Sequence, residues 1–316
     1  MKALALTDFD TPPAVHDLPT PEPGLGQVRV RVKAAALNGI DAAISSGMAQ
    51  AMAEHQFPVV IGRDAAGIVD AVGDGVEHVS VGDEVLGHIL FAPPLHHGTI
   101  AEYAILPTDA VVAKPASLDF TAAAALPLAG AAALTAIDAA DLQQGQTVLI
   151  AGAAGGVGSF AIQLAVARGA TVIATGLPED ADRLRRLGAS EVVDYRQDVA
   201  EQVLAEHPEG VDALLDLVTF DPDSFDKLAQ AVRRGGKVGS TTTTATPDAL
   251  EAAGLTGQAI FALPNRDTLN TLLGEIERGA LRVDVQQIFS LDEASRGLET
   301  LASRTARGKL VVAIDT

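Results

Sequence analysis

The first 120 residues alternate short apolar runs with turn residues. Val28–Lys33 alternates apolar and basic positions with period two, as a half-buried strand does. Further strands are predicted over 59–61, 66–72 and 83–86, with Pro and Gly punctuating the segments between them. The pattern predicts an all-β-leaning domain with little helix.

The period changes after residue 120. Residues 121–140 are rich in Ala and Leu and predict a helix with Pro127 near its start. Strands predicted over 147–151, 171–174, 191–194, 213–218 and 237–239 then alternate with helices near 156–168, 179–187, 199–207 and 222–233. Because strand–helix alternation with short connections is typical of a doubly wound parallel sheet, the sequence predicts an α/β Rossmann domain.

The tail changes character again. A helix over 268–278 and a strand over 283–285 are followed by a helix over 292–302 and a strand over 309–314. This last strand has no sheet partner nearby in the sequence, so we expect it to return to the N-terminal domain. We therefore predict one domain over 1–120, completed by 265–316, and a second domain over 121–264.

Composition excludes several classes of partner and site. The net charge of −19, from 41 acidic and 22 basic residues, repels phosphate backbones and anionic membranes, so we expect neither nucleic acid nor a membrane as a partner. The chain contains no Cys, which excludes disulfides and thiolate metal sites. The N-terminal residues lack the pattern of a signal peptide, and we expect a cytoplasmic protein.

The strongest local motif is a glycine-rich turn over 151–158, between a predicted strand and a predicted helix. Glycines there permit a tight turn and close helix–strand packing, and a pyrophosphate can lie at the helix N-terminus. Ala153 replaces the usual first glycine of the G-x-G-x-x-G pattern. A ligand-free turn is the alternative, but a second strand at the expected distance favours a dinucleotide site. Its predicted residues are Ala153, Gly155, Gly156, Val157 and Gly158.

The end of the second strand bears on the choice of cofactor. NAD sites commonly place an acidic residue there, to accept a hydrogen bond from the ribose 2′-hydroxyl. This chain has Thr175 and Gly176, which favours NADPH, although Glu179 and Asp180 close by argue the other way. Side chains that follow can supply donors or contacts, and the predicted cofactor site is completed by Thr175, Gly176, Arg183, Tyr195, Leu217 and Lys309.

Several motifs in a fixed order carry a resemblance that covers nearly the whole chain. They lie at 35–41, 61–69, 79–85, 98–103, 123–130, 151–158 and 308–312. The chain resembles the medium-chain dehydrogenase/reductase superfamily, in its zinc-independent quinone oxidoreductase-like (zeta-crystallin-like) branch. The resemblance implies a chaperonin-10-like (GroES-like) β domain over 1–120 with the substrate and catalytic site, a Rossmann dinucleotide-binding domain over 121–264, and a homodimer or homotetramer.

The resemblance also implies that no zinc is bound. Zinc-dependent relatives present Cys, His and Cys or Asp at positions that hold Asn38, Arg63 and Leu128 here, and a guanidinium or an isobutyl group does not ligate zinc. A short loop around 88–97 takes the place of the structural zinc lobe. Ala43 and Ala132 replace a Tyr and a Thr that some relatives carry near the nicotinamide. Both replacements remove a hydroxyl group, so the resemblance does not fix which substrate is reduced.

Few side chains are candidates for the chemistry. The resemblance places Asn38 beside the nicotinamide, where it either donates to the acceptor oxygen or acts as a loop-capping amide. Asp41 either orients its neighbours or caps the helix that starts there. For Arg63 we favour an ion pair with Asp64 that supports the turn over a place facing the site. His96 and His97 are expected to be exposed loop residues, and the proton is expected to come from water.

The function predicted is an NADPH-dependent reductase that transfers hydride to a quinone or an α,β-unsaturated carbonyl compound. Because the nicotinamide carries the chemistry, the protein supplies position and electrostatics. One alternative is a reductase of simple ketones or enoyl thioesters. Another is a non-catalytic NADP(H)-binding sensor or structural protein, which a panel of quinones and enones distinguishes from an enzyme.

Overall fold

The computed structural model describes residues 1–315 and divides the chain into two compact units. Unit 1 comprises Met1–Leu128, Leu263–Gly274 and Val283–Thr316. Unit 2 comprises Ala129–Ala262 and Glu275–Arg282. The boundaries predicted from the sequence, at 120 and 264, lie close to these divisions, but the short segment 275–282 joins unit 2 rather than the unit of its neighbours.

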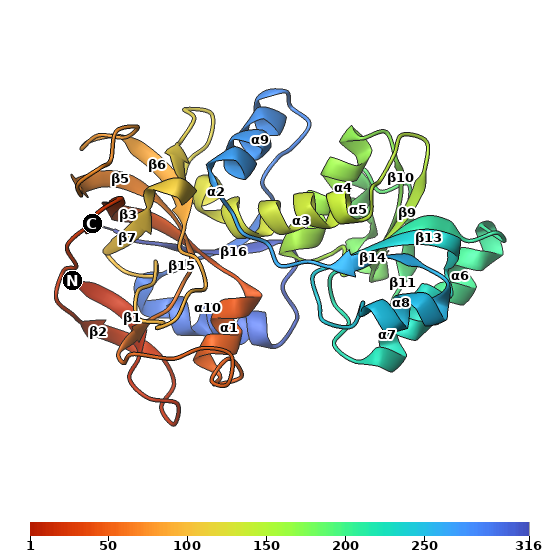
Figure 1. The fold of residues 1–316 in the computed structure, drawn as a ribbon, viewed down its shortest axis with the longest axis horizontal. Helices are drawn as coiled ribbons and strands as arrows, with labels where there is room; N and C mark the ends of the chain where they lie inside the picture. The colour runs from red at the N-terminus through yellow and green to blue at the C-terminus, as the bar shows by residue number, and fades with distance from the viewer. Residues whose placement is uncertain (316) are drawn as a thin grey trace. The chain divides into compact units, whose positions relative to one another are not determined.

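Unit 2 is built on a six-stranded sheet with the strand order β11-β10-β9-β12-β13-β14, and every neighbouring pair is parallel. Helices α4 and α5 cover one face and α6, α7 and α8 the other (Figure 1). This arrangement confirms the predicted doubly wound sheet. Its strands are β9 (Thr147–Ala151), β10 (Thr171–Gly176), β11 (Glu191–Asp194), β12 (Val211–Asp216), β13 (Val232–Ser240) and β14 (Thr256–Ala259). Its helices are α4 (Gly156–Ala167), α5 (Ala181–Leu187), α6 (Val199–Glu206), α7 (Pro222–Ala229) and α8 (Pro247–Ala253).

Unit 1 contains a seven-stranded sheet, β15-β16-β3-β5-β6-β8 with β7 also paired to β3, and a three-stranded sheet, β2-β1-β4. Its strands are β1 (Lys2–Leu6), β2 (Ala14–Asp17), β3 (Gln27–Leu37), β4 (Val59–Val60), β5 (Asp64–Val72), β6 (Glu84–His88), β7 (Tyr103–Pro107), β8 (Val111–Ala113), β15 (Val285–Ser290) and β16 (Lys309–Ala313). Its helices are α1 (Gly39–Ser45), α2 (Phe120–Ala125), most of α9 (Arg266–Glu277) and α10 (Ala294–Ala302); α3 (Pro127–Ala139) runs from unit 1 into unit 2. Single 3₁₀ turns lie at Thr108–Ala110, Pro178–Asp180 and Leu291–Glu293.

The last strand behaves only partly as predicted. β16 pairs with β3 in antiparallel fashion, which confirms that it returns to the N-terminal part of the chain. It also pairs in parallel with β15, so the expectation that it has no partner nearby in the sequence was wrong. Helix α10 connects β15 to β16, which gives this pair the strand–helix–strand order that a parallel pair requires.

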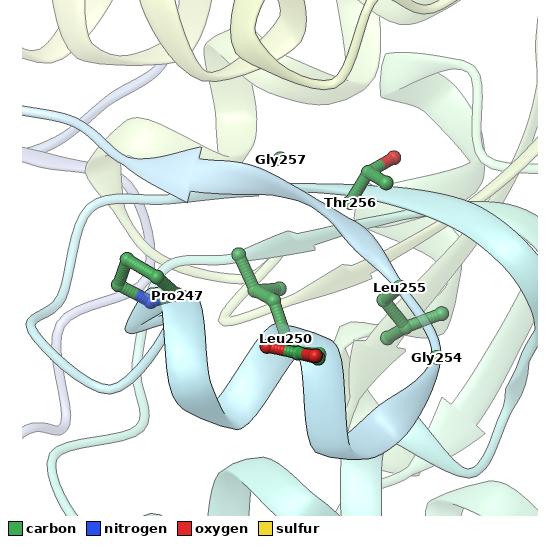
Figure 2. Close-up of a pocket in the computed structure, with 7 residues that line it drawn as sticks. Pro247, Leu250, Gly254, Leu255, Thr256 and Gly257 are labelled. Carbon is green, nitrogen blue, oxygen red and sulfur yellow. The ribbon is translucent and has the colours of Figure 1, made fainter.

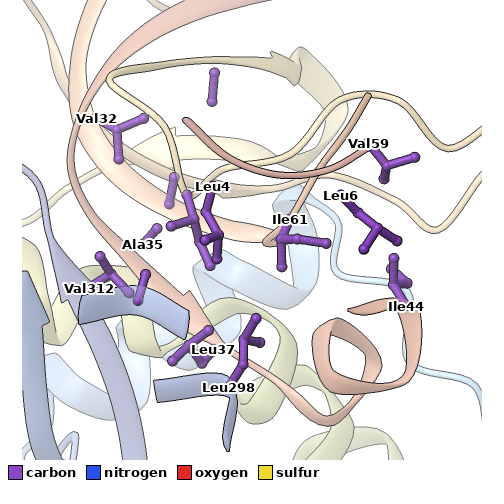
Figure 3. Close-up of a cluster of buried hydrophobic side chains, with 14 of the residues drawn as sticks. Leu4, Leu6, Val32, Ala35, Leu37, Ile44, Val59, Ile61, Leu298 and Val312 are labelled. Carbon is purple, nitrogen blue, oxygen red and sulfur yellow. The ribbon is translucent and has the colours of Figure 1, made fainter. Parts of the chain in front are cut away.

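The core of unit 1 extends to the end of β3. Along this strand Val28, Val30 and Val32 are buried while the positions between them are only partly covered, and from Ala34 to Leu37 every residue is buried. Leu37 packs with Leu4, Ile61, Leu298 and Val312 (Figure 3). Because β3 ends inside the core, Asn38, the residue that follows it, is also buried in the interior of unit 1.

Two predicted helices end differently in the structure. The helix expected over 121–140 is two helices, α2 and α3, which break at Leu126. Pro127 lacks the N–H that would continue α2 but suits the first turn of a new helix. The helix expected over 222–233 ends at Ala229, because the chain enters β13 at Val232 and pairs with β12.

Candidate active site and cofactor loop

Sheet register brings four polar residues to one edge of the large sheet in unit 1. Ala36 lies opposite Asp64, Asp64 opposite His88, and Leu310 opposite Leu37. In an antiparallel sheet the end of one strand lies beside the start of the next. Asn38 and His88 at strand ends, and Asp64 and Lys309 at strand starts, therefore meet although they lie far apart in the sequence.

These four side chains form a buried hydrogen-bonded chain. Lys309 Nζ donates to the Leu37 carbonyl at 3.1 Å and to Asn38 Oδ1 at 2.6 Å. Asn38 Nδ2 donates to Asp64 Oδ2 at 2.9 Å, and Nδ1 of His88 lies 2.7 Å from Asp64 Oδ1. Burial lowers the pKa of the Lys309 ammonium, and the charges of Asp64 and Asp41 oppose that shift. The chain fixes the orientation of the Asn38 amide, which sequence analysis singled out.

Asp41 lies in the first turn of α1 and is fully buried. Its Oδ2 accepts a hydrogen bond from the backbone N–H of Asn38 at 2.8 Å, whereas its Oδ1 has no partner among residues 1–315. Burial raises the pKa of the Asp41 carboxyl to about 6, although the nearby positive charge of Arg63 acts in the opposite direction. Asp41 therefore caps the start of α1, one of its two predicted roles, and is a buried carboxyl that changes charge just below neutral pH.

Arg63 is 2% exposed and lies just before β5. The predicted ion pair with Asp64 is not formed, because Asp64 accepts instead from Asn38 and from the backbone N–H of Leu128 at 3.2 Å, and contacts His88. Nε and Nη2 of Arg63 are buried and have no hydrogen-bond partner in the described part of the chain. Burial lowers the pKa of this guanidinium, while Asp41 and Asp64 act in the opposite direction.

The residues at the positions of zinc ligands in related enzymes do not fit a metal. The Asn38 side chain and the backbone N–H of Leu128 both donate hydrogen bonds to Asp64. The oxygen of Asn38 already accepts from Lys309, Leu128 offers an apolar side chain, and the charge of Arg63 repels a cation. Residues 1–315 contain no group of three or more His, Asp or Glu side chains able to hold a metal ion. His96 Nδ1 lies 2.8 Å from the Gln56 carbonyl.

The glycine-rich turn lies in unit 2, at the carboxyl end of β9. A Cβ atom at Gly158 would lie 2.5 Å from the Cα of Ala153, so only glycine allows α4 to pack this closely on the strand. At Gly155, the residue before α4, a Cβ would come no closer than 3.4 Å to its neighbours. Gly156 and Val157 occupy the first turn of α4 and are partly exposed. The first N–H groups of a helix have no partner within the helix, so this turn offers donors suited to an anion.

Three other predicted cofactor residues contact residues of this turn or of the strand end before it. Thr175 Oγ1 accepts from the N–H of Gly152 at 3.0 Å, and Arg183 Nη2 donates to the carbonyl of Ala154 at 2.6 Å. The N–H of Leu217 donates to the carbonyl of Ala151 at 3.1 Å. Tyr195 is 48% exposed, just after β11. Lys309 is the exception, because it belongs to unit 1 and to the buried chain of Asn38.

Gly176 at the end of β10 packs closely against the side chain of Leu184. A Cβ at Gly176 would lie 2.4 Å from Cδ1 of Leu184, so a larger residue there requires the Leu184 side chain to shift. Asp180, which argued for NAD in the sequence, is buried, and its Oδ2 accepts from the N–H of Leu177 at 3.2 Å. Glu179 is exposed and remains the acidic group nearest in sequence.

Sequence analysis missed two buried polar groups. His88 was treated only as the start of a loop, because its contact with Asp64 depends on strand register. Asp216, at the end of β12, accepts hydrogen bonds from Thr219, Thr242 and Thr244. The available signal was the run of hydroxyl residues at 240–244, which follows the predicted strand over 237–239. The hydrogen bonds from this run to Asp216 join the ends of β12 and β13.

Comparison with known proteins agrees with this architecture. A family model described as "Alcohol dehydrogenase GroES-like domain" matches residues 24–116, and one described as "Zinc-binding dehydrogenase" matches residues 187–312. The NADPH-dependent alkenal/one oxidoreductase of Arabidopsis thaliana is 32% identical, over 99% of this chain and 79% of the relative. The quinone oxidoreductase of Pseudomonas aeruginosa is 33% identical, over 94% of each chain. The solved quinone oxidoreductase of Coxiella burnetii is 31% identical with a TM-score of 0.88, over 100% of this chain and 99% of the other.

A GroES-like unit with a buried polar site and a Rossmann unit with a glycine-rich turn define a dehydrogenase or reductase of the two-unit, dinucleotide-dependent kind. The chain belongs to the medium-chain dehydrogenase/reductase superfamily, in its quinone oxidoreductase-like branch. The family and fold class predicted from the sequence are confirmed.

Proposed function

We propose that this protein is an NADPH-dependent, zinc-independent oxidoreductase that transfers hydride to a quinone or an α,β-unsaturated carbonyl compound. The observation that carries the proposal is the turn at the end of β9, which leaves the first N–H groups of α4 for a pyrophosphate. It supports a dinucleotide reaction in a chain whose full-length relatives are named as reductases of quinones and of alkenals or enones. Reaction class and cofactor are those predicted from the sequence.

NADPH supplies the hydride when it is bound, and the chain supplies its binding site. We assign the pyrophosphate to the turn at 153–158 and the adenosine ribose to the end of β10, where Gly176 leaves no carboxylate to repel a 2′-phosphate. Arg183 is held near this turn by its bond to the Ala154 carbonyl. Tyr195, Leu217 and Lys309 remain proposed cofactor contacts.

The acceptor must take hydride without a metal, so hydrogen bonds provide its polarisation. Quinones and conjugated enones suit such a site, because the negative charge delocalises onto an oxygen remote from the attacked carbon. Asn38 uses one N–H for Asp64, and its second N–H is the proposed donor to that oxygen. Because Lys309 donates to its oxygen, the amide is polarised and cannot rotate without losing two hydrogen bonds.

Steady-state kinetics with a panel of quinones, enones, simple ketones and alcohols tests this function. We expect NADPH oxidation with the first two classes and weak turnover of the others. Asn38→Leu should lower kcat by roughly ten- to a thousand-fold, the range for losing one oxyanion donor. The exposed Asn270→Leu in α9 is the matched control. Absence of turnover with every quinone and enone would refute the function, and an unchanged kcat with unchanged cofactor affinity would exclude Asn38.

A homodimer or homotetramer in the cytoplasm completes the proposal. Every residue of β14, the edge strand of the Rossmann sheet, is exposed. A shallow pocket lined by Leu250, Leu255 and Gly257 lies between this strand and α8 (Figure 2). An exposed edge strand favours pairing with another strand, and β14 of a second copy of this chain can supply that strand. No helix within residues 1–315 is long and apolar enough to cross a membrane. Sedimentation as a monomer at micromolar concentration would contradict the oligomer.

A further inference from the structure

The buried polar cluster of unit 1 consists of Asn38, Asp41, Arg63, Asp64, His88 and Lys309. Arg63 is the one charged side chain of this cluster for which the structure shows no hydrogen bond within residues 1–315. Its Nε and Nη2 are buried without a partner, although Asp41 and Asp64 are near enough to act on its charge. A buried cation without hydrogen bonds is much less favourable than the same cation in water. Such a group is a candidate for a functional role, because a ligand can supply what the fold does not.

The other charges of the cluster are occupied. Asp64 accepts from the side chain of Asn38 and the backbone of Leu128, and contacts His88. Lys309 donates to a carbonyl and to the Asn38 amide. The charged groups of Asp64 and Lys309 are therefore already engaged in hydrogen bonds within the protein. Besides Arg63, Oδ1 of Asp41 is the only buried side-chain atom of this cluster without a hydrogen-bond partner among residues 1–315. Asp41 and Arg63 each shift the pKa of the other toward its charged form.

We propose that Arg63 binds and polarises the reducible oxygen of the acceptor. This inference rests on the proposed function and names the group that stabilises the charge. Arg63 directly precedes Asp64, whose carboxylate accepts hydrogen bonds from the side chain of Asn38 and the backbone of Leu128. A guanidinium stays protonated, is planar, and presents several donors to one oxygen.

The electron balance shows why a fixed cation serves here. When hydride adds to a ring carbon of a quinone, its electron pair forms the new C–H bond and the conjugated carbonyl π pair moves onto oxygen, which gives an enolate. Tautomerisation, in which a proton of that carbon moves to the second oxygen, converts this enolate into a hydroquinone monoanion. With an enone, hydride adds to the β-carbon and gives an enolate. One proton from water then completes the hydroquinone or the saturated ketone. Arg63 stabilises the anionic oxygen without giving up its own proton, and Asn38 can add one neutral N–H.

A probe that is not turned over tests the site by equilibrium binding. 4-Nitrophenol resembles a hydroquinone monoanion when ionised, and its phenolate is read by absorbance. We titrate it into the NADP⁺-saturated protein across pH. Binding to the wild-type protein should lower its pKa by about one unit or more, which is at least a tenfold preference for the phenolate. Arg63→Met should abolish this preference, and Arg63→Lys should retain part of it, because the charge stays while the planar fork is lost.

Kinetics supply the second measurement. Arg63→Met should lower kcat for enones and quinones by about a hundred- to a thousand-fold, with the NADPH Kd changed less than twofold. The loss should be greater for weakly activated enones than for quinones, since a stronger electrophile needs less polarisation. The matched control is Arg266→Met, which removes an exposed arginine from unit 1 and should change neither measurement.

The outcomes separate this inference from the proposed function. A phenolate preference that survives Arg63→Met, or its absence in the wild-type protein, would overturn the role of Arg63. If Arg63→Met does not fold, Arg63→Lys decides, and unchanged binding and kcat in that variant also refute the role. A wild-type protein that reduces no acceptor but binds phenolate through Arg63 would remove the proposed function and leave this site standing.

Discussion

Replacing Asp41 by Asn should make the protein more stable at alkaline pH. Burial raises the pKa of Asp41 from 3.8 to about 6 in the folded protein. A difference of about two pKa units corresponds to about 3 kcal/mol between the two protonation states. Because the folded pKa is raised, the stability contributed by the protonated carboxyl is fully present below the unfolded value and is lost as pH rises through about 6. Above that pH the buried carboxylate costs the full amount.

An Asn side chain has nearly the shape of the protonated carboxyl, and its oxygen can still accept the N–H of Asn38. We therefore expect Asp41→Asn to match the wild-type free energy of unfolding near pH 4 and to exceed it by up to about 3 kcal/mol at pH 8. The attraction of Arg63 is already contained in the raised pKa, so it does not reverse the sign. Urea unfolding of both proteins between pH 4 and 8 measures the difference, and the exposed Asp10→Asn is the control. A pH-independent difference, or a less stable variant at pH 8, would refute the reasoning.

Three further predictions concern cofactor and metal. Chelator treatment should leave activity and Tm unchanged, because Asn38, Arg63 and Leu128 do not ligate zinc; stoichiometric zinc in active, chelator-treated protein would contradict this. NADPH should raise Tm more than NADH at equal concentration, because the tighter ligand stabilises more, and an equal shift in differential scanning fluorimetry would argue against the role of Gly176. Gly158→Val should weaken NADPH binding at least tenfold, about 1.4 kcal/mol, by pushing α4 off the strand, whereas Gly155→Ala should bind nearly normally in a fluorescence titration.

Local patterns sufficed for much of the fold. The Rossmann strands and helices follow one another with strong periodicity, and the strand at 147–151 was predicted with the bounds that the structure shows. Sequence analysis missed β1 and β2, because each strand is too short for its periodicity to stand out. The β14 strand was also missed, since its Thr-Gly-Gln-Ala sequence lacks the apolar alternation of a half-buried strand.

The candidate site was harder to predict than the fold. Motif order pointed to Asn38 and Asp41, but the roles of Arg63 and His88 depend on which strand ends meet. An ion pair between Arg63 and its neighbour Asp64 was the natural expectation for adjacent opposite charges. Strand register instead gives Asp64 to Asn38 and His88, and it leaves the guanidinium without a partner in the described residues. Sequence spacing carries no information about such competition between partners.

The bond between Lys309 and Asn38 joins residues 271 positions apart, and it sets an order of events during synthesis of the protein. The sheet of unit 2 is formed within one continuous stretch, so it can fold as soon as that stretch has left the ribosome. The edge of β3 in unit 1 must wait for β16, which is translated after the whole Rossmann segment. A nascent chain can therefore form its Rossmann sheet before the hydrogen bond between Lys309 and Asn38 completes the polar site.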